Sequence, residues 1–321
     1  MEDVLVVGEA LVDIVERLDG SSAEHPGGSP ANVALGLARL GRSVHLLTRI
    51  GNDDRGRAVR AHLEASGVHL VEGSITAQRT STATARIDAL GVAAYEFDLD
   101  WRLETRPDLA RFRGLHAGSI AAFLAPGGDA VLDLIHAAAG RLTVTYDPNA
   151  RPRLMGDAPP ARARVERIVA QADLVKVSDE DLAWLTPGED PVAVALVWQA
   201  SGPAVVVVTR GSRGALAACR AGVVEVPAPH VTVIDTVGAG DAFMSGLIDY
   251  LAGADLLGGQ RLAALRDMGL TGVEEMIAYA ARVAAITCSR AGADPPTWAE
   301  LAASCDAPDE GAAPSHRDQG P

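Results

Sequence analysis

One stretch of the sequence combines a carboxylate with a turn of very small residues, running from Asp235 through Gly238, Ala239 and Gly240 to Asp241. Residues with so little side chain let the backbone approach a ligand closely, and successive N–H groups at a helix start suit an anion such as phosphate. A carboxylate at that place can accept the proton of a hydroxyl group that attacks phosphorus. The alternative is that Asp241 is simply the N-cap of a helix that follows a glycine turn.

The elements around this turn must position it. Residues 231–235 are mostly β-branched and predict a buried strand, and a helix is expected to begin near Asp241. Further strands are predicted at 4–8, 113–117, 142–146, 173–177 and 204–209, and helices at 128–139, 160–171 and 277–288. Their alternation indicates βαβ units and a parallel sheet with helices on both faces. In such sheets ligands bind at the carboxyl ends of the strands.

A different pattern, short and alternating, covers residues 82–87 and 92–97 and predicts a hairpin. Together with residues 10–18 it would form a small sheet that closes over a substrate and excludes water. Arg86 and Phe97 are candidates for contact with the substrate from this sheet. A solvated charge and a packing aromatic are equally open interpretations of the two residues.

Two polar residues near the N-terminus are further candidates. Asp13 follows the first strand, where it could bind a ligand's hydroxyl groups or be an ordinary surface residue of an edge strand. Asn32 lies in the first turn of a helix predicted over 31–40, directly after a stiff turn that contains Gly28. Its amide could bind sugar hydroxyls or cap its own helix.

Length and composition limit the classes of protein. With 321 residues, 48% of them hydrophobic, the chain can form one large α/β domain with an appended piece, or two small domains. A net charge of −14 argues against a nucleic-acid surface and, less strongly, against an anionic membrane. Lysine occurs once, at Lys176, which excludes the Gly-Lys-Ser/Thr of a P-loop nucleotide site.

The cysteines and the N-terminus bear on the compartment. Cys219, Cys288 and Cys305 have neither paired spacing nor neighbouring histidines, so they predict reduced thiols rather than disulfides or a zinc site. The acidic N-terminus leads directly into a strand, and no apolar run approaches the length of a membrane span. We therefore expect a cytoplasmic protein.

Two segments carry a resemblance to a known family. Asp-Thr-Val-Gly-Ala-Gly-Asp at 235–241 and His-Pro-Gly-Gly-Ser-Pro-Ala-Asn-Val-Ala at 25–34 closely resemble the two signatures of the ribokinase-like (PfkB) carbohydrate kinases, in a fructokinase-like form. The resemblance runs from about residue 3 to about residue 300. It implies a three-layer α/β/α sandwich with a mostly parallel central sheet, in which a kinase domain spans 1–303 and residues of about 10–29 and 72–101 form a β-sheet lid. Residues 304–321 lack periodicity and predict a disordered tail.

The resemblance also implies roles for individual residues. The catalytic base would be Asp241, and the N–H groups of Gly238, Ala239 and Gly240 would hold the transferring phosphoryl group. The substrate-side residues would be Asp13, Gly28, Asn32, Asn149 and Arg151, with Arg86 and Phe97 from the lid. The nucleotide-side residues would be Ser178, Asp181, Thr209, Gly211 and Gly214. Asp235 would help form a monovalent-cation site together with backbone carbonyls of residues 290–293.

One position departs from the family pattern. Asp181 stands where the family has Glu, and its side chain is one methylene shorter, which puts its water-mediated contact with Mg²⁺ in question. Glu180 could take its place, or the acids at 179–181 could merely favour a helix start.

The expected activity is the transfer of the γ-phosphoryl group of ATP to a monosaccharide hydroxymethyl group, with Mg²⁺ and a monovalent cation such as K⁺. Fructose is the expected sugar, and 2-keto-3-deoxygluconate or a ribokinase-type substrate is the alternative. A homodimer through the lid is one arrangement that the resemblance suggests. A non-enzyme alternative is a catalytically silent regulator that binds a sugar or nucleotide. A dinucleotide-binding oxidoreductase is disfavoured because no Gly-x-Gly-x-x-Gly follows the first strand.

Overall fold

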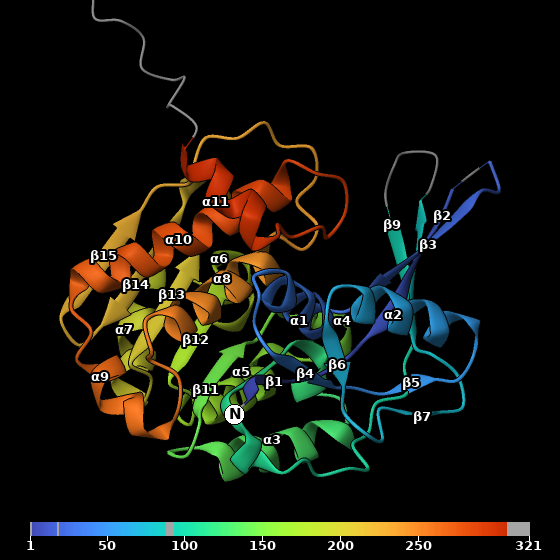
Figure 1. Ribbon diagram of the computed structural model, residues 1–321, viewed down its shortest axis with the longest axis horizontal. Coiled ribbons are helices and arrows are strands. Elements are labelled where there is room, and N and C mark those ends of the chain that lie inside the picture. The colour runs from blue at the N-terminus through green and yellow to red at the C-terminus, as the bar shows by residue number, and fades with distance from the viewer. Residues whose placement is uncertain (1, 18, 88–92, 307–321) are drawn as a thin grey trace, which may run out of the picture.

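The computed structural model describes residues 2–17, 19–87 and 93–306. Within them, a nine-stranded sheet forms the centre of the body (Figure 1). Its strands are, in spatial order, β15 (Gly222–Val226), β14 (Ala215–Cys219), β13 (Val205–Thr209), β12 (Leu174–Ser178), β11 (Thr143–Asp147), β10 (Phe112–Gly118), β1 (Glu2–Val7), β4 (Val44–Leu47) and β6 (Val68–Leu70). Neighbouring strands are parallel except for the pairs β13–β14 and β14–β15.

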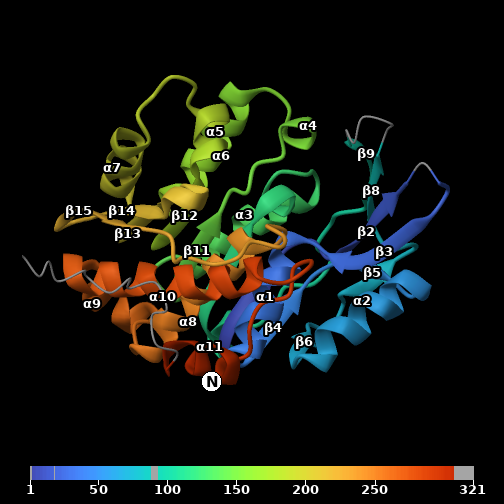
Figure 2. The same cartoon turned by 90° about the horizontal axis from the view of Figure 1, so that it is seen from above.

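Helices cover both faces of this sheet, as Figure 2 shows from above. On one face lie α1 (Ser29–Arg39), α2 (Asp54–Ala65), α8 (Ala239–Gly253), α9 (Leu262–Arg266) and α10 (Leu270–Cys288), with α11 (Trp298–Asp306) against α10. On the other lie α3 (Gly127–Ala138), α5 (Ala158–Val169), α6 (Asp179–Leu185) and α7 (Pro191–Ser201). The short α4 (Pro152–Met155) precedes α5.

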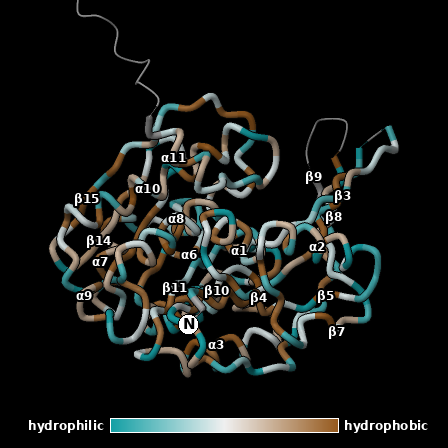
Figure 3. Tube along the Cα trace, viewed as in Figure 1, coloured by the Kyte–Doolittle hydropathy of each residue, from teal (hydrophilic) through white to brown (hydrophobic). Residues whose placement is uncertain are grey.

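The apolar strands explain these three layers. In β13, Val205 and Val207 belong to one hydrophobic core while Val206 and Val208 belong to the other. A strand that is apolar on both sides requires cover on both sides, which parallel sheets with crossover helices provide. In Figure 3 hydrophobic stretches follow the inner strands and helices. The predicted three-layer α/β/α sandwich is confirmed.

A second sheet stands beside the body at the place of the predicted lid, and we refer to it by that name (Figure 1). Its strands are β3 (Ser22–Gly27), β2 (Leu11–Glu16), β8 (Thr82–Ile87) and β9 (Ala93–Asp98), in that order. The hairpin of β8 and β9 was expected, whereas β3 is an additional strand that pairs antiparallel with β2. Residues 75–77 form β7 (Ile75–Ala77), which pairs with β5 (Ile50–Gly51) outside the lid sheet.

The predicted buried strand over 231–235 is wrong. This segment has no regular structure, and the side chains of Val233 and Ile234 are 58% and 65% exposed. The N–H groups of Ile234 and Asp235 donate to the carbonyl of Cys288 at the end of α10 instead of to a neighbouring strand. A β-branched run makes a strand only where a sheet edge receives it. The helix after the turn begins at Ala239, so Asp241 lies in its first turn.

Two further expectations concern the chain end and membranes. Helix α11 extends to Asp306, so the predicted boundary at residue 304 falls within its last turn. The rest of the predicted tail, 307–321, lies outside the described residues. Within the described ranges, no helix combines the length and the apolar character that crossing a membrane requires.

Candidate active site

The glycine turn before α8 is held in a backbone conformation that a side chain would strain. Gly238 has φ +74°, and a Cβ there would stand 2.5 Å from the Cβ of Ala293. The N–H groups of the first helical turn have no carbonyl partner within the helix, so those of Gly240 and Asp241 can bind a ligand. The N–H of Ala239, which was also predicted to hold the phosphoryl group, instead donates to the Thr236 carbonyl at 3.2 Å.

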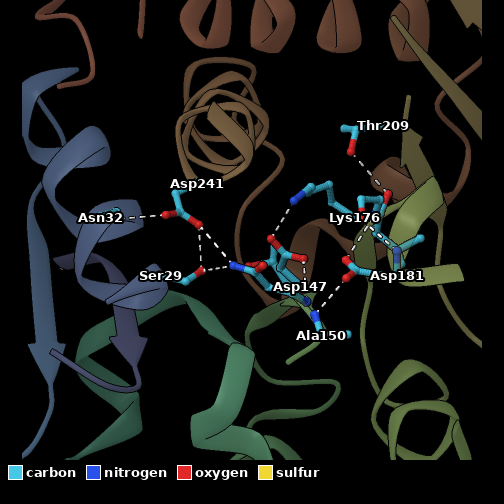
Figure 4. Close-up of polar contacts among 12 residues, drawn as sticks. Ser29, Asn32, Asp147, Ala150, Lys176, Asp181, Thr209 and Asp241 are labelled. Atoms are coloured by element: carbon cyan, nitrogen blue, oxygen red, sulfur yellow. Dashed lines mark hydrogen bonds and ion pairs between the residues drawn. The ribbon is translucent and has the colours of Figure 1, made fainter. Parts of the chain in front are cut away.

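Asp241 does not cap its own helix, because the N-cap residue is Gly238. The Asp241 side chain is 7% exposed and turns toward α1 (Figure 4). Its Oδ1 accepts a hydrogen bond from Ser29 Oγ at 2.7 Å, and its Oδ2 accepts one from Asn32 Nδ2 at 2.8 Å. Burial raises the pKa of Asp241, while the bonds from Ser29 and Asn32 and the charge of Lys176 oppose the rise. The residue is thus a buried carboxylate with an elevated pKa.

The start of α1 brings two partners to this carboxylate. Gly28 has φ +106°, and a Cβ there would lie 2.5 Å from the carbonyl oxygen of Glu9, so the close turn requires glycine. Ser29, which sequence reasoning passed over, is buried and also accepts a hydrogen bond from Asn149 Nδ2 at 2.7 Å. The structure therefore joins Asn32 and Asn149, both predicted, around Asp241.

Asp13 and Arg151 lie at the open side of the same site. Asp13 is on an exposed position of β2, and its Oδ2 lies over Gly27, where a Cβ would be only 2.0 Å away. Surrounding protein atoms partly desolvate the carboxyl group and raise the pKa of Asp13 to about 6, and the charge of Arg151 opposes this. Arg151 Nη1 donates to Asn149 Oδ1 at 2.6 Å. Polar groups from three distant segments thus lie near one another, and the charges of Arg151 and Asp241 both act on Asp13.

The two substrate-binding candidates of the lid, Phe97 and Arg86, lie on opposite faces of its sheet. Asp13 pairs with Ala83, and Ala83 pairs with Phe97, so Phe97 lies on the same face of the lid as Asp13. Arg86 pairs with Glu16 in the register and therefore lies on the opposite face. Its guanidinium contacts the carboxylates of Glu16 and Glu96, each at 2.8 Å. The structure brings Phe97 but not Arg86 to the face that the site occupies.

The predicted nucleotide residues cluster at the carboxyl ends of β12 and β13. Gly211 and Gly214 both have positive φ, and a Cβ at Gly214 would meet the carbonyl oxygen of Val226 at 2.0 Å. Thr209 ends β13, and its hydroxyl lies 3.5 Å from the carbonyl oxygen of Val177. These residues form a turn directly beside the start of α6.

Ser178 and Asp181 form a capping box at the start of α6. Asp181 Oδ1 also accepts a hydrogen bond from the Ala150 N–H at 2.9 Å, which ties α6 to the loop after β11 (Figure 4). The interpretation of the acids as a favourable helix start therefore holds for Asp181. Burial raises the pKa of Asp181, and the charge of Asp147 adds to this effect.

An ion pair between Lys176 and Asp147 also lies at this edge of the sheet. Lys176 Nζ donates to Asp147 Oδ2 at 2.7 Å, and their side chains are 4% and 1% exposed (Figure 4). Sequence reasoning assigned neither residue a role. A signal was present, since the one lysine of the chain interrupts an otherwise apolar strand.

Asp235 joins the turn to the segment after α10. Its Oδ1 accepts from the Val237 N–H at 3.0 Å, and its Oδ2 accepts from the Gly292 N–H at 2.8 Å. These bonds lower the pKa of Asp235, so it is a carboxylate at neutral pH. The predicted neighbours in a cation site, Asp235 and residues 290–293, therefore do lie together.

Comparison with known proteins identifies the family. A family model described as pfkB family carbohydrate kinase matches residues 1–300. The chain belongs to this kinase family. A fructokinase from Klebsiella pneumoniae is 37% identical to this PfkB kinase over 260 residues, which cover 78% of this chain and 84% of the relative.

Solved structures extend the similarity along nearly the full length of the PfkB chain. A fructokinase from Xylella fastidiosa with bound ATP has a TM-score of 0.81 and 27% identity, covering 94% of this chain and 97% of that one. A fructokinase double mutant from Vibrio cholerae O395 with fructose, ADP and potassium bound has a TM-score of 0.74 and 27% identity, covering 94% and 98%.

Proposed function

We propose that this PfkB kinase is a fructokinase, which transfers the γ-phosphoryl group of ATP to a hydroxymethyl group of free fructose. The observation that carries the proposal is the position of Asp241, a buried carboxylate in the first turn of α8, beside free backbone N–H groups and the amides of Asn32 and Asn149. The names of the relatives, all three of them fructokinases, support the choice of sugar.

In the proposed reaction Asp241 accepts the proton of the attacking hydroxyl group. The hydroxyl oxygen forms a bond to the γ-phosphorus, the bond from that phosphorus to the bridging oxygen breaks, and the electron pair leaves with ADP. The N–H groups of Gly240 and Asp241 stabilise the charge on the transferring group. Only ionised Asp241 can accept the proton, so its elevated pKa sets the acid limb of the pH profile.

The sugar would bind between the lid and α1. Asp13, Asn32, Asn149 and Arg151 offer acceptors and donors suited to an uncharged polyol, and Gly28 allows close backbone approach. Phe97 would contact the substrate from the lid. Buried polar partners discriminate strongly, because a substrate without the matching hydroxyl leaves them unpaired.

ATP would lie across the ends of β12 and β13, along the turn of Thr209, Gly211 and Gly214. Val233 and Ile234, which are exposed beside the glycine turn, offer an apolar surface for the adenine base. In that position the γ-phosphate would reach the start of α8. Ser178 and Asp181 would border the phosphates.

Within the described residues, no group of three or more His, Cys, Asp or Glu could hold a metal ion. A Mg²⁺ held chiefly by ATP phosphates and water, with Asp181 as a water-mediated neighbour, needs no such group of protein ligands. The ion would supply charge neutralisation at the phosphates. Asp235 and the carbonyls of 290–293 would hold a monovalent cation such as K⁺.

The lid also suggests the quaternary structure. Its sheet ends in two edge strands, β3 and β9, and stands away from the body (Figure 1). We propose that two copies pair through their lids, and light scattering of the purified protein tests the mass. We also propose a cytoplasmic location, where thiols such as Cys219 and Cys288 stay reduced.

A comparison of kcat/KM over a substrate panel tests the function. The panel holds fructose, ribose, adenosine, fructose 6-phosphate and 2-keto-3-deoxygluconate, and fructose should give the highest value. An advantage of about tenfold or more for the keto acid would replace fructose with an acidic sugar, and Arg151→Ala would then remove that advantage. No phosphorylation of any sugar, with nucleotide still bound, would refute the kinase and favour a silent regulator.

A further inference from the structure

Lys176 is the one lysine of the chain, and arginine occupies every other Lys/Arg position. The sequence holds 28 lysine and arginine residues together, and Lys176 is its single lysine. The structure buries this residue almost completely, with 4% of its side chain exposed. A buried ion pair is seldom a net source of stability, because desolvation offsets the attraction between the charges. The burial of Lys176 beside Asp147 therefore calls for a reason other than stability.

The location of the ammonium group supplies that reason. A Cβ at Gly240 would stand 3.0 Å from Lys176 Nζ, so the ammonium lies directly at the start of α8. Figure 4 shows Nζ directed toward the space between Asp147 and Asp241. This is the place where the N–H groups of the turn would meet a phosphoryl group.

The ammonium also has donors to spare. An ammonium carries three N–H donors. In the part of the chain that the structure describes, Nζ makes one hydrogen bond, to Asp147 Oδ2 at 2.7 Å. The remaining donors sit in a buried position next to the anion-binding turn, and a negatively charged ligand would satisfy them.

The space around Nζ suits lysine in particular. Lysine presents a compact point charge, whereas the arginine guanidinium is a larger planar fork. With only 3.0 Å between Nζ and a Cβ on Gly240, a guanidinium would fill the place of the ligand. Glycine at 240 and lysine at 176 together keep that place open.

We propose that Lys176 is a catalytic residue, whose ammonium contacts the transferring phosphoryl group opposite the N–H groups of Gly240 and Asp241, and that Asp147 is the positioning residue that aims it. The inference rests on the proposed phosphoryl transfer. The ammonium keeps its protons throughout, while the proton of the sugar hydroxyl goes to Asp241 and the bridging oxygen leaves with ADP. Against the desolvation imposed by burial, the carboxylates of Asp147, Asp181 and Asp241 raise the pKa of Lys176, which preserves its charge.

A double variant, Lys176→Met with Asp147→Asn, removes both charges together and leaves no unpaired buried ion. We expect kcat to fall by about 10²–10³, the range for loss of a donor that stabilises transition-state charge, with the affinity for fructose little changed. Asp173→Asn is the matched control, since Asp173 is a buried carboxylate at the opposite end of β12 and should leave kcat unchanged. A folded double variant with kcat close to that of the wild type would overturn the proposal.

Nucleotide binding separates contact with the phosphoryl group from a purely structural role. The double variant should bind β,γ-methylene-ATP about tenfold or more weakly while its affinity for ADP stays nearly unchanged, since only the former carries a γ-phosphate. Equal losses for both nucleotides would show that Lys176 merely supports the fold.

The single lysine permits a direct observation in the unmodified protein. After labelling with ¹⁵N-lysine, one side-chain Nζ resonance is expected from the chain. It should shift more with β,γ-methylene-ATP than with ADP, and identical spectra would overturn the contact. Both binding measurements are independent of turnover. If the wild type phosphorylates no sugar the proposed function fails, whereas an active wild type with an equally active double variant refutes only the role of Lys176.

Discussion

Replacing Ser29 with alanine removes the hydroxyl that donates to Asp241 Oδ1 at 2.7 Å. Burial raises the pKa of Asp241, and the bond from Ser29 is the largest contribution that opposes the rise. A hydrogen bond to a charged group contributes about 1.5–3 kcal/mol. Its loss should make the carboxylate hold its proton to higher pH, so the acid limb of the pH profile should move upward.

The size of the effect depends on pH. At pH values below the pKa of Asp241, losing about 1.5–3 kcal/mol of hydrogen-bond free energy leaves roughly 10- to 100-fold less of this residue ionised. Activity at those pH values should fall by the same factor. Above the limb Asp241 is ionised in both proteins, and the variant should stay within about tenfold of the wild type. The assay is kcat/KM for fructose between about pH 5 and pH 9, because this ratio reports groups of the free enzyme.

Ser245→Ala is the matched control. Ser245 is a fully buried serine of the same helix α8, and its hydroxyl donates to the Ala242 carbonyl rather than to Asp241. Its acid limb should coincide with that of the wild type. An unchanged limb in folded Ser29→Ala, or a limb displaced to lower pH, would refute the assignment of Asp241 as the titrating base.

Three other substitutions test the rest of the site. Asp241→Asn should lower turnover by about 10²–10⁴ in steady-state kinetics. It should also raise the free energy of unfolding in urea at neutral pH. Burial raises the pKa of Asp241 in the folded state, so ionising this carboxyl group as pH rises lowers the stability of the wild type, whereas the asparagine amide stays uncharged. Gly240→Val should lower kcat more than fructose affinity measured by calorimetry, since its side chain would enter the 3.0 Å space before Lys176 Nζ; an unaltered kcat would remove the turn from the phosphoryl site. Asp13→Ala should reduce kcat/KM for fructose and leave the KM for ATP unchanged, and a loss confined to ATP would contradict its place on the sugar side.

Local patterns in the sequence were sufficient for most of the architecture. The alternation of apolar strands and helices between residues 112 and 178 and the hairpin of β8 and β9 follow from period and turn residues, and the structure confirms them. The segment 231–235 shows the limit of the same reasoning. Its β-branched residues have strand propensity, yet it joins none of the sheets in the part of the chain that the structure describes, and Val233 and Ile234 are exposed.

The residues of the candidate site also divide into those that local sequence could identify and those that it could not. Asp241, Asn32 and Asn149 could be selected as polar residues at strand ends or helix starts, because ligands of parallel sheets bind there. Arg86 could not be judged locally, since the face it occupies depends on the register between β8 and β2.

The sequence by itself determined the glycine turn, the carboxylate in it and most of the strands and helices, because these depend on residues close together in the chain. Only the tertiary structure decided which groups meet that carboxylate. Ser29 and Asp241 are separated by 212 positions, and Lys176 and Asp147 by 29, and each pair lies within 2.7 Å. Contacts at such separations arise when strand pairing and helix packing close the chain, and no local pattern records which side chains will then be neighbours.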